Sequence, residues 1–252
     1  MSTGEVGVAF AIEPVWAIVA GRMGSSRLPG KTLVPLAGRP SLAHIVDRLR
    51  RVGGLAGVVI ATTTEPADEQ IRELAGAMGI PCHAGSQDDV LGRTLAAARA
   101  VGARTIVQVT GDCPLVEPEL VAEAIELYRE QRPDYVSTVL GEETFPVGLD
   151  VEVFSTELLA EVDSLTNDPR DREHVSLYIY EHSERFRCVG IQASGRRRRP
   201  DLRVCIDTAE DLEVVGALYQ ALWPANPAFG VDEVIDFFDR HPELAHRNRS
   251  AG

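Results

Sequence analysis

Short apolar runs that are rich in valine and isoleucine alternate with amphipathic stretches of helical length over the first two thirds of the chain. Runs of this kind are typical of buried parallel strands, which need a connection of about helical length between them. The pattern therefore predicts an α/β fold with a mainly parallel sheet. The predicted strands are 15–20, 57–62, 80–84 and 104–110, and the predicted helices are 41–52, 67–78, 88–101 and 117–131.

The regular alternation ends after residue 131. Because the stretch that follows is too short for a core of its own, residues of roughly 140–182 are interpreted as an inserted β/α arm of one domain, 1–252. The two ends, 1–13 and 243–252, are expected to be disordered. In this part of the chain the predicted strands are 135–140, 150–154, 186–192 and 202–206, and the predicted helices are 156–162, 171–182, 209–222 and 231–240.

The chain is acidic, with 38 Asp and Glu against 25 Lys and Arg and a net charge of −13. Such a surface repels nucleic acid and anionic lipid, so we expect no nucleic-acid partner. No apolar run approaches the roughly 18 residues of a membrane span, and the first residues lack the pattern of a secretory signal. The four cysteines form no Cys-x-x-Cys pair and predict neither a zinc site nor a disulfide framework. A cytoplasmic protein without a membrane partner is expected.

A glycine-rich loop, GRMGSSRLPGK at 21–31, follows the first predicted strand, at the sheet edge where α/β folds bind ligands. The loop is not a P-loop, because five residues rather than four separate its second and third glycines, and it lacks the glycine spacing of a dinucleotide fingerprint. It carries the cations Arg22, Arg27 and Lys31, and Lys31 is the only lysine in the chain. A compact ammonium can reach a phosphate where a planar guanidinium does not fit. We therefore predict a phosphate-binding loop of another kind.

Two aspartates each follow a predicted strand: Asp112 comes after 104–110 and Asp207 after 202–206. A sheet can bring both carboxylates to one edge. Magnesium prefers one or two carboxylates together with phosphate oxygens and water, so the pair predicts a Mg²⁺ site. Capping of the helix that follows Asp207 is the alternative interpretation.

Four consecutive arginines, Arg196–Arg199, form the only low-complexity segment. A charge run of this kind is typical of a solvated loop. The alternative is a loop that faces an anionic substrate.

The string AIVAGRMGSSRLPGKTLVPLAGRPSL resembles the opening of cytidylyltransferases of the spore-coat polysaccharide type, which are related to the CMP-3-deoxy-octulosonate and CMP-sialate synthetases. The resemblance continues, in the same order, with GSQDDVLGR, TGDCPL, FPVGLDVEVF, REHVSLYIY and LRVCIDTAEDLEVV. It implies a doubly wound, Rossmann-like sheet of the nucleotide-diphospho-sugar transferase type. It also implies Mg²⁺-dependent transfer of CMP from CTP to an acidic sugar or another small hydroxyl, phosphate or phosphonate acceptor, with release of pyrophosphate.

The resemblance also implies roles for individual residues. Arg22, Arg27 and Lys31 would neutralise the triphosphate as catalytic groups, and Asp112 and Asp207 would hold Mg²⁺. The implied nucleotide-binding residues are Ala20, Gly21, Gly24, Ser25, Ser26, Gly85, Ser86, Asp89 and Thr110. The implied acceptor-binding residues are Asp150, Glu152 and His174. Helix capping explains the residues around Asp89 equally well, and a histidine in an amphipathic helix is more often a structural residue.

The expected partners are CTP, a small anionic acceptor and a second copy of the chain in a homodimer. The arm concentrates apolar side chains that it is too short to bury alone, and such surface is typical of an interface. These side chains are Phe145, Pro146, Val147, Leu149, Tyr178 and Tyr180. Two other functions remain open at this point: uridylyl or guanylyl transfer on the same fold, and a catalytically inactive nucleotide-binding regulatory protein.

Overall fold

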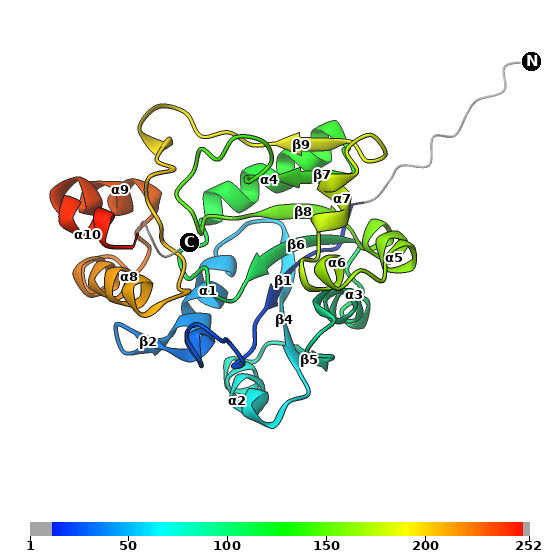
Figure 1. Ribbon diagram of the computed structural model, residues 1–252, viewed down its shortest axis with the longest axis horizontal. Coiled ribbons are helices and arrows are strands. Elements are labelled where there is room, and N and C mark those ends of the chain that lie inside the picture. The colour runs from blue at the N-terminus through cyan, green and yellow to red at the C-terminus, as the bar shows by residue number, and fades with distance from the viewer. Residues whose placement is uncertain (1–11, 249–252) are drawn as a thin grey trace, which may run out of the picture.

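The computed structural model describes residues 12–248, and a seven-stranded sheet lies at its centre between two groups of helices (Figure 1). The strand order is β5-β4-β1-β6-β8-β7-β9, and only β8 runs antiparallel to its neighbours. The predicted α/β fold with a mainly parallel sheet is therefore confirmed. The strands are β1 (Val15–Ala20), β4 (Leu55–Thr63), β5 (Cys82–Gly85), β6 (Thr105–Thr110), β7 (Tyr135–Ser137), β8 (Glu152–Ser155) and β9 (Cys188–Gly190).

Each face of the sheet has its own hydrophobic core. Along β1, Ala17 and Val19 contribute to one core and Ile18 to the other, as the two-residue repeat of a strand requires. The first core is closed by α1 (Ser41–Leu49), α2 (Glu69–Met78), α4 (Pro118–Gln131), α8 (Ala209–Leu222), α9 (Val231–Arg240) and α10 (Pro242–Arg247). The second is closed by α3 (Val90–Ala100), α5 (Thr156–Leu165) and α7 (Leu177–Glu181), and α6 (Pro169–Glu173) packs against α3.

The predicted strand at 202–206 is wrong. This segment is buried, but it makes only an isolated bridge between Val147 and Arg203. Its backbone bonds connect loops instead, because Val204 N–H donates to Val147 O and Ile206 N–H donates to Asp112 O, both at 2.8 Å. The apolar alternation of the segment therefore reflects burial between loops and not a place in the sheet.

Two other expectations need correction. The predicted helix at 171–182 is two short helices, α6 and α7, with an irregular turn from His174 to Ser176 between them. The C-terminal stretch expected to be disordered from 243 forms α10 as far as Arg247. Residues 1–11 and 249–252 lie outside the described part of the chain. A two-stranded hairpin of β2 (Pro35–Leu36) and β3 (Arg39–Pro40) was not predicted.

The residues interpreted as an arm are built into the main sheet, since β8 lies between β6 and β7. Pro146 and Leu149 are buried within the chain, and Phe145 packs against the first core. Most of the apolar side chains that were expected to need a partner are therefore covered already. Tyr180, which is 37% exposed, is the clearest exception.

The four-arginine run is paired with carboxylates of its own chain. Arg196, Arg197 and Arg199 form ion pairs with Asp236, Asp232 and Asp239 of α9, and Arg198 pairs with Glu142. The run therefore connects its loop to α9 and to the start of the arm. The alternative of a loop that faces an anionic substrate is not supported. Over residues 12–248, no helix is both long enough and apolar enough to cross a membrane.

Candidate active site

Two loops meet where β1 and β6 end. The last residues of these parallel strands, Ala20 and Thr110, are register partners, and Gly111 N–H donates to Ala20 O at 2.7 Å. A side chain at Gly21 would lie 3.0 Å from the Thr32 methyl group, so the glycine allows this close approach. The loops after both strands therefore open at one sheet edge, the place where α/β folds bind ligands.

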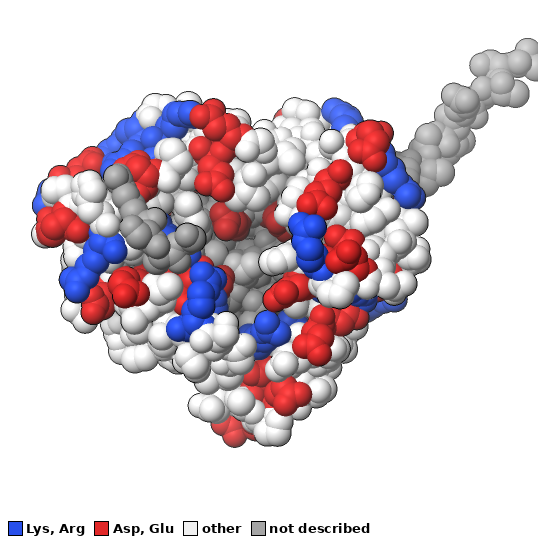
Figure 2. Space-filling view, in the orientation of Figure 1, with Lys and Arg blue, Asp and Glu red and all other residues white. Residues whose placement is uncertain are grey.

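A cavity of about 440 Å³ lies at this edge, and Figure 2 shows a hollow at the centre of the same face with acidic and basic side chains around it. Most of the predicted site residues line it: Ala20, Gly21, Arg22, Gly24, Ser25, Ser26, Arg27, Lys31, Thr110, Asp112, His174 and Asp207. These predicted residues come from four separate parts of the sequence and share one cavity.

The glycine-rich loop is held in shape by its own backbone. Met23 O accepts hydrogen bonds from the N–H groups of Ser25 and Gly30, both at 2.9 Å. Gly30 has φ +77°, a conformation that favours glycine, and a 3₁₀ turn begins at Lys31. The buried Asp68 accepts a bond from Met23 N–H at 2.7 Å and anchors the loop to the protein. The loop therefore presents its cations to the cavity from a fixed backbone.

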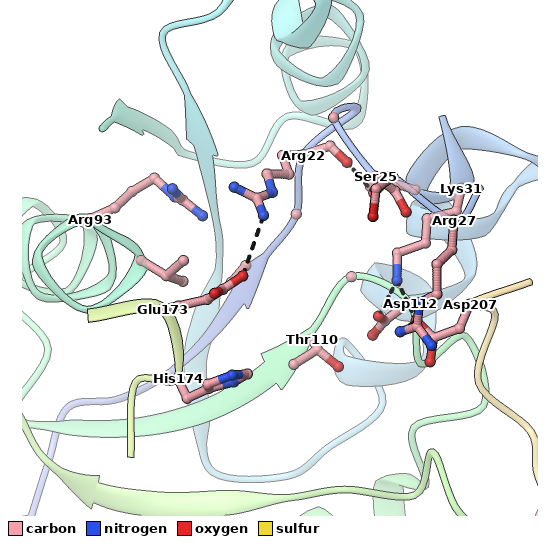
Figure 3. Close-up of a pocket in the computed structure, with 17 residues that line it drawn as sticks. Arg22, Ser25, Arg27, Lys31, Arg93, Thr110, Asp112, Glu173, His174 and Asp207 are labelled. Atoms are coloured by element: carbon pink, nitrogen blue, oxygen red, sulfur yellow. Dashed lines mark hydrogen bonds and ion pairs between the residues drawn. The ribbon is translucent and has the colours of Figure 1, made fainter. Parts of the chain in front are cut away.

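Lys31 lies between the two aspartates of the predicted metal site (Figure 3). Its Nζ is 2.5 Å from Asp112 Oδ2 and 2.7 Å from Asp207 Oδ1, and Arg27 approaches Asp207 at 2.9 Å. Burial alone would lower the pKa of Lys31, but the two carboxylates raise it above its ordinary value. Burial alone would raise the pKa of Asp207, but Lys31, Arg27 and Arg203 hold it below its ordinary value. Both aspartates are thus placed to interact with a cation.

The loop connection explains how residues so distant in sequence meet. The bond from Ile206 N–H to Asp112 O places Asp207 beside Asp112. The helix that follows is capped by Thr208, whose hydroxyl accepts from Asp211 N–H while Asp211 accepts from Thr208 N–H. The alternative interpretation of Asp207 as the helix cap is therefore wrong, because its carboxylate does not cap the helix.

The donor set fits a magnesium ion that is bound together with a nucleotide. Two carboxylate oxygens lie within 2.7 Å of one ammonium nitrogen, which shows that a single cation can contact both. Over the described chain, no group of three or more His, Cys, Asp or Glu side chains could hold a metal ion. A metal at this position would need phosphate oxygens and water as further ligands, which is the set that magnesium prefers. The ammonium of Lys31 would have to move away from at least one carboxylate.

Five predicted residues do not line the cavity: Gly85, Ser86, Asp89, Asp150 and Glu152. Asp89 caps α3 by accepting from Gly92 N–H at 2.9 Å and pairs with Arg172 at 2.6 Å, so the capping interpretation holds for this residue. Burial raises the pKa of Asp150 to about 6 and that of Glu152 to about 7. Glu152 accepts a bond from Ser176 Oγ at 2.8 Å.

Sequence reasoning missed several residues of the cavity wall: Thr32, Val90, Arg93, Gly111 and Glu173. Glu173 lies 3.6 Å from Arg22, and Arg22 Nη1 also donates to Gln87 O at 3.0 Å. Arg93 belongs to the GSQDDVLGR string, but its place within a predicted amphipathic helix gave no sign that it faces a cavity. Which side chains face the cavity depends on how the elements pack together, and only the structure shows that.

A mainly parallel sheet with a cation-rich cavity at its carboxyl edge is typical of nucleotide-binding α/β proteins. The family model described as cytidylyltransferase matches residues 16–224. The spore coat polysaccharide biosynthesis protein SpsF of Bacillus subtilis is 34% identical over 233 residues, which cover 90% of this chain and 95% of SpsF. A 3-deoxy-manno-octulosonate cytidylyltransferase of Geobacter sulfurreducens is 30% identical over 66% of this chain and 75% of its own.

A solved structure of a cytidylyltransferase from Leptospira borgpetersenii matches with a TM-score of 0.86 and 30% identity, over 93% of this chain and 97% of that one. CMP:2-keto-3-deoxy-manno-octonic acid synthetase, solved with CTP, shares the fold at a TM-score of 0.63 and 20% identity, over 82% of this chain and 99% of that one. The chain belongs to the cytidylyltransferase family and is a nucleotidyltransferase.

Proposed function

We propose that the protein transfers CMP from CTP to a small acceptor and releases pyrophosphate, with Mg²⁺ as cofactor. The observation that carries this proposal is the cluster of Lys31, Asp112 and Asp207 in the cavity where the glycine-rich loop ends. The names of the relatives support CTP as the donor, because the proteins with 30–34% identity include one named as a cytidylyltransferase.

The side chains of the loop would bind and orient the triphosphate. Arg22, Arg27 and Lys31 supply positive charge along one side of the cavity, where charge develops on the α-phosphate and on the departing pyrophosphate. Mg²⁺ held by Asp112 and Asp207 would supply further neutralisation of the phosphate oxygens. Lys31, released from the carboxylates, would donate to a phosphate oxygen. Catalysis then depends mainly on orientation and charge, with the acceptor oxygen in line with the leaving group.

The acceptor would enter beside His174, whose exposed side chain lines the cavity on the side away from Lys31 (Figure 3). Asp150 and Glu152 are further from the cavity, and their proposed contact with the acceptor requires the neighbouring side chains to open a path. A hydroxyl acceptor must lose a proton during transfer, whereas a phosphate or phosphonate acceptor need not. A small anionic acceptor stays the prediction for the end of the cavity beside His174.

Release of pyrophosphate tests the proposal. The protein is incubated with Mg²⁺, each of the four NTPs, and a panel of acidic sugars, sugar phosphates and phosphonates. We expect release with CTP and at least one acceptor, and none when Mg²⁺ is removed by a chelator. Release with UTP or GTP in place of CTP would assign another nucleotide. Nucleotide binding without release over the whole panel would contradict the transferase function.

We also propose a homodimer. The proposal rests on the resemblance and on the exposed Tyr180, because most of the other apolar side chains of the arm are covered within the chain. Sedimentation velocity at micromolar concentration, with and without CTP, should give the mass of two chains. Tyr180→Asp should shift the wild-type distribution toward one chain, because a charge is costly to bury in an interface. A wild-type protein that sediments as one chain would rule out the dimer.

A further inference from the structure

The two oxygens of the Asp207 carboxylate have different partners. Oδ1 faces the cations of the cavity, with Lys31 Nζ at 2.7 Å and Arg27 Nη2 at 2.9 Å (Figure 3). Oδ2 accepts a hydrogen bond from Arg203 Nη2. The last side-chain torsion of an aspartate is broad and does not by itself fix the direction of the carboxylate. The bond from Arg203 therefore fixes which oxygen of Asp207 faces the cavity.

Arg203 contacts Asp207 from outside the cavity. Its side chain is 13% exposed, and it is not one of the residues that line the cavity wall. Its Nε donates to Oδ1 of Asp211, which is fully buried, at 3.0 Å. One guanidinium thus spans a carboxylate of the site and a carboxylate of the core. The planar fork of an arginine can make both contacts at once, whereas the point charge of a lysine is not shaped for them.

The buried Asp211 also fixes the backbone of the same site residue. Its Oδ2 accepts hydrogen bonds from the N–H groups of Asp207 and Thr208, both at 3.0 Å. Asn248, which directly follows α10, donates from Nδ2 to Asp211 Oδ1 at 2.9 Å and to Arg203 O at 3.1 Å. The main chain and the side chain of Asp207 are therefore held by one connected network.

Neutralisation of a buried acid is the simplest role for Arg203, because an unpaired Asp211 would be costly. That role requires the contact with Asp211 and does not require a contact with Asp207. Lys31 and Arg27 already supply two cations to the Asp207 carboxylate. A third cation is not needed to balance its charge, so the bond from Arg203 calls for another explanation.

We propose that Arg203 is a positioning residue that orients Asp207, so that Oδ1 is presented to the divalent cation. The proposal rests on the function proposed above. Hydrogen bonds from surrounding residues orient the carboxylates of metal sites, and their loss typically lowers metal affinity or activity by about 10- to 100-fold. Arg203 would keep Oδ2 occupied after Lys31 has left Oδ1. Asp207 would then offer one oxygen and leave the other positions to phosphate oxygens and water, as magnesium prefers.

Arg203→Lys tests the proposal, because it keeps a charge beside Asp211 and loses the fork that spans two carboxylates. Mn²⁺ is titrated into the protein in the presence of a non-hydrolysable CTP analogue. We expect the Kd for Mn²⁺ to rise about 10- to 100-fold. Arg199→Lys is the matched control, since Arg199 also spans two aspartates, Asp201 and Asp239, and all three lie outside the cavity wall. This control should bind Mn²⁺ as the wild type does.

Two further measurements separate a positioning role from a purely structural one. The affinity of Arg203→Lys for the analogue in the presence of a chelator should equal that of the wild type, because Arg203 does not line the cavity. The Mg²⁺ concentration that gives half-maximal pyrophosphate release should rise by the same factor as the Kd for Mn²⁺. A lower melting temperature combined with wild-type affinity for Mn²⁺ would overturn the proposal.

Asn248→Ala decides the question if Arg203→Lys does not fold. It alters no charge and removes the donor that holds Asp211 and the backbone of Arg203. We expect Mn²⁺ to bind on the order of 5-fold more weakly, which corresponds to the loss of about one hydrogen bond. Wild-type affinity in this variant would overturn the positioning role alone. A wild type that binds the analogue and no Mn²⁺ would reject the metal site, and with it the proposed Mg²⁺-dependent function.

Discussion

Asp112→Asn should lower magnesium-dependent turnover on the order of 10³-fold without unfolding the protein, because metal-ion stabilisation of phosphate charge is worth several kcal/mol. The substitution keeps the shape of the side chain and removes the charge that a divalent ion requires. It also removes one of the two carboxylates that contact Lys31 Nζ, but it leaves Asp207 paired with Lys31 and Arg27. Pyrophosphate release and thermal unfolding are measured on the same preparation.

Asp207→Asn should lose activity to a similar degree and should also lower the melting temperature. Asp207 contacts Lys31, Arg27 and Arg203, so its neutralisation leaves three cations together without their common partner. Asp47→Asn is the matched control, since Asp47 pairs with Arg39 on the surface and lies outside the cavity. Mn²⁺ binding in the presence of a non-hydrolysable CTP analogue provides a readout that does not depend on turnover. If both variants bind the metal and turn over normally, the metal site is elsewhere.

Lys31→Arg is expected to preserve the fold and to lower activity by about 10²- to 10³-fold, the usual effect of the loss of one well-placed charge contact. The ammonium fits between two carboxylates at 2.5 and 2.7 Å and must then reach a phosphate. The planar guanidinium is bulkier and presents its donors in a fixed fork, so it should hold the carboxylates and release them poorly. Arg39→Lys, which makes the reverse exchange of arginine for lysine on the surface hairpin, is the control. Near-normal turnover of Lys31→Arg would refute a specific need for lysine.

The sequence was sufficient for the central part of the fold because fully buried strands carry an unbroken apolar signal. The predicted strand at 15–20 coincides with β1, and that at 104–110 differs from β6 by one residue. The segment at 202–206 carries a similar signal for another reason, because it is buried between loops. An apolar pattern in the sequence shows that a segment is buried. It does not show whether the backbone of that segment pairs with a neighbouring strand or with loops.

The candidate site was predictable where a residue type is unusual and not where a contact depends on distant packing. The single lysine drew attention to Lys31, and the structure places it with Asp112 and Asp207. Its position between the two carboxylates could not be predicted, since it depends on the bond from Ile206 to Asp112 across nearly a hundred residues. Arg93 was missed because arginine in an amphipathic helix is normally exposed.

The central claim is that the cavity beside Lys31 binds CTP and Mg²⁺ between Asp112 and Asp207. A crystal structure of the protein with Mg²⁺ and a non-hydrolysable CTP analogue tests it most directly. We predict the triphosphate along the loop at 21–31, with a metal ion about 2.1 Å from one oxygen of each aspartate and Lys31 Nζ moved onto a phosphate oxygen. A nucleotide bound elsewhere, or aspartate carboxylates too far apart to share one ion, would contradict the claim.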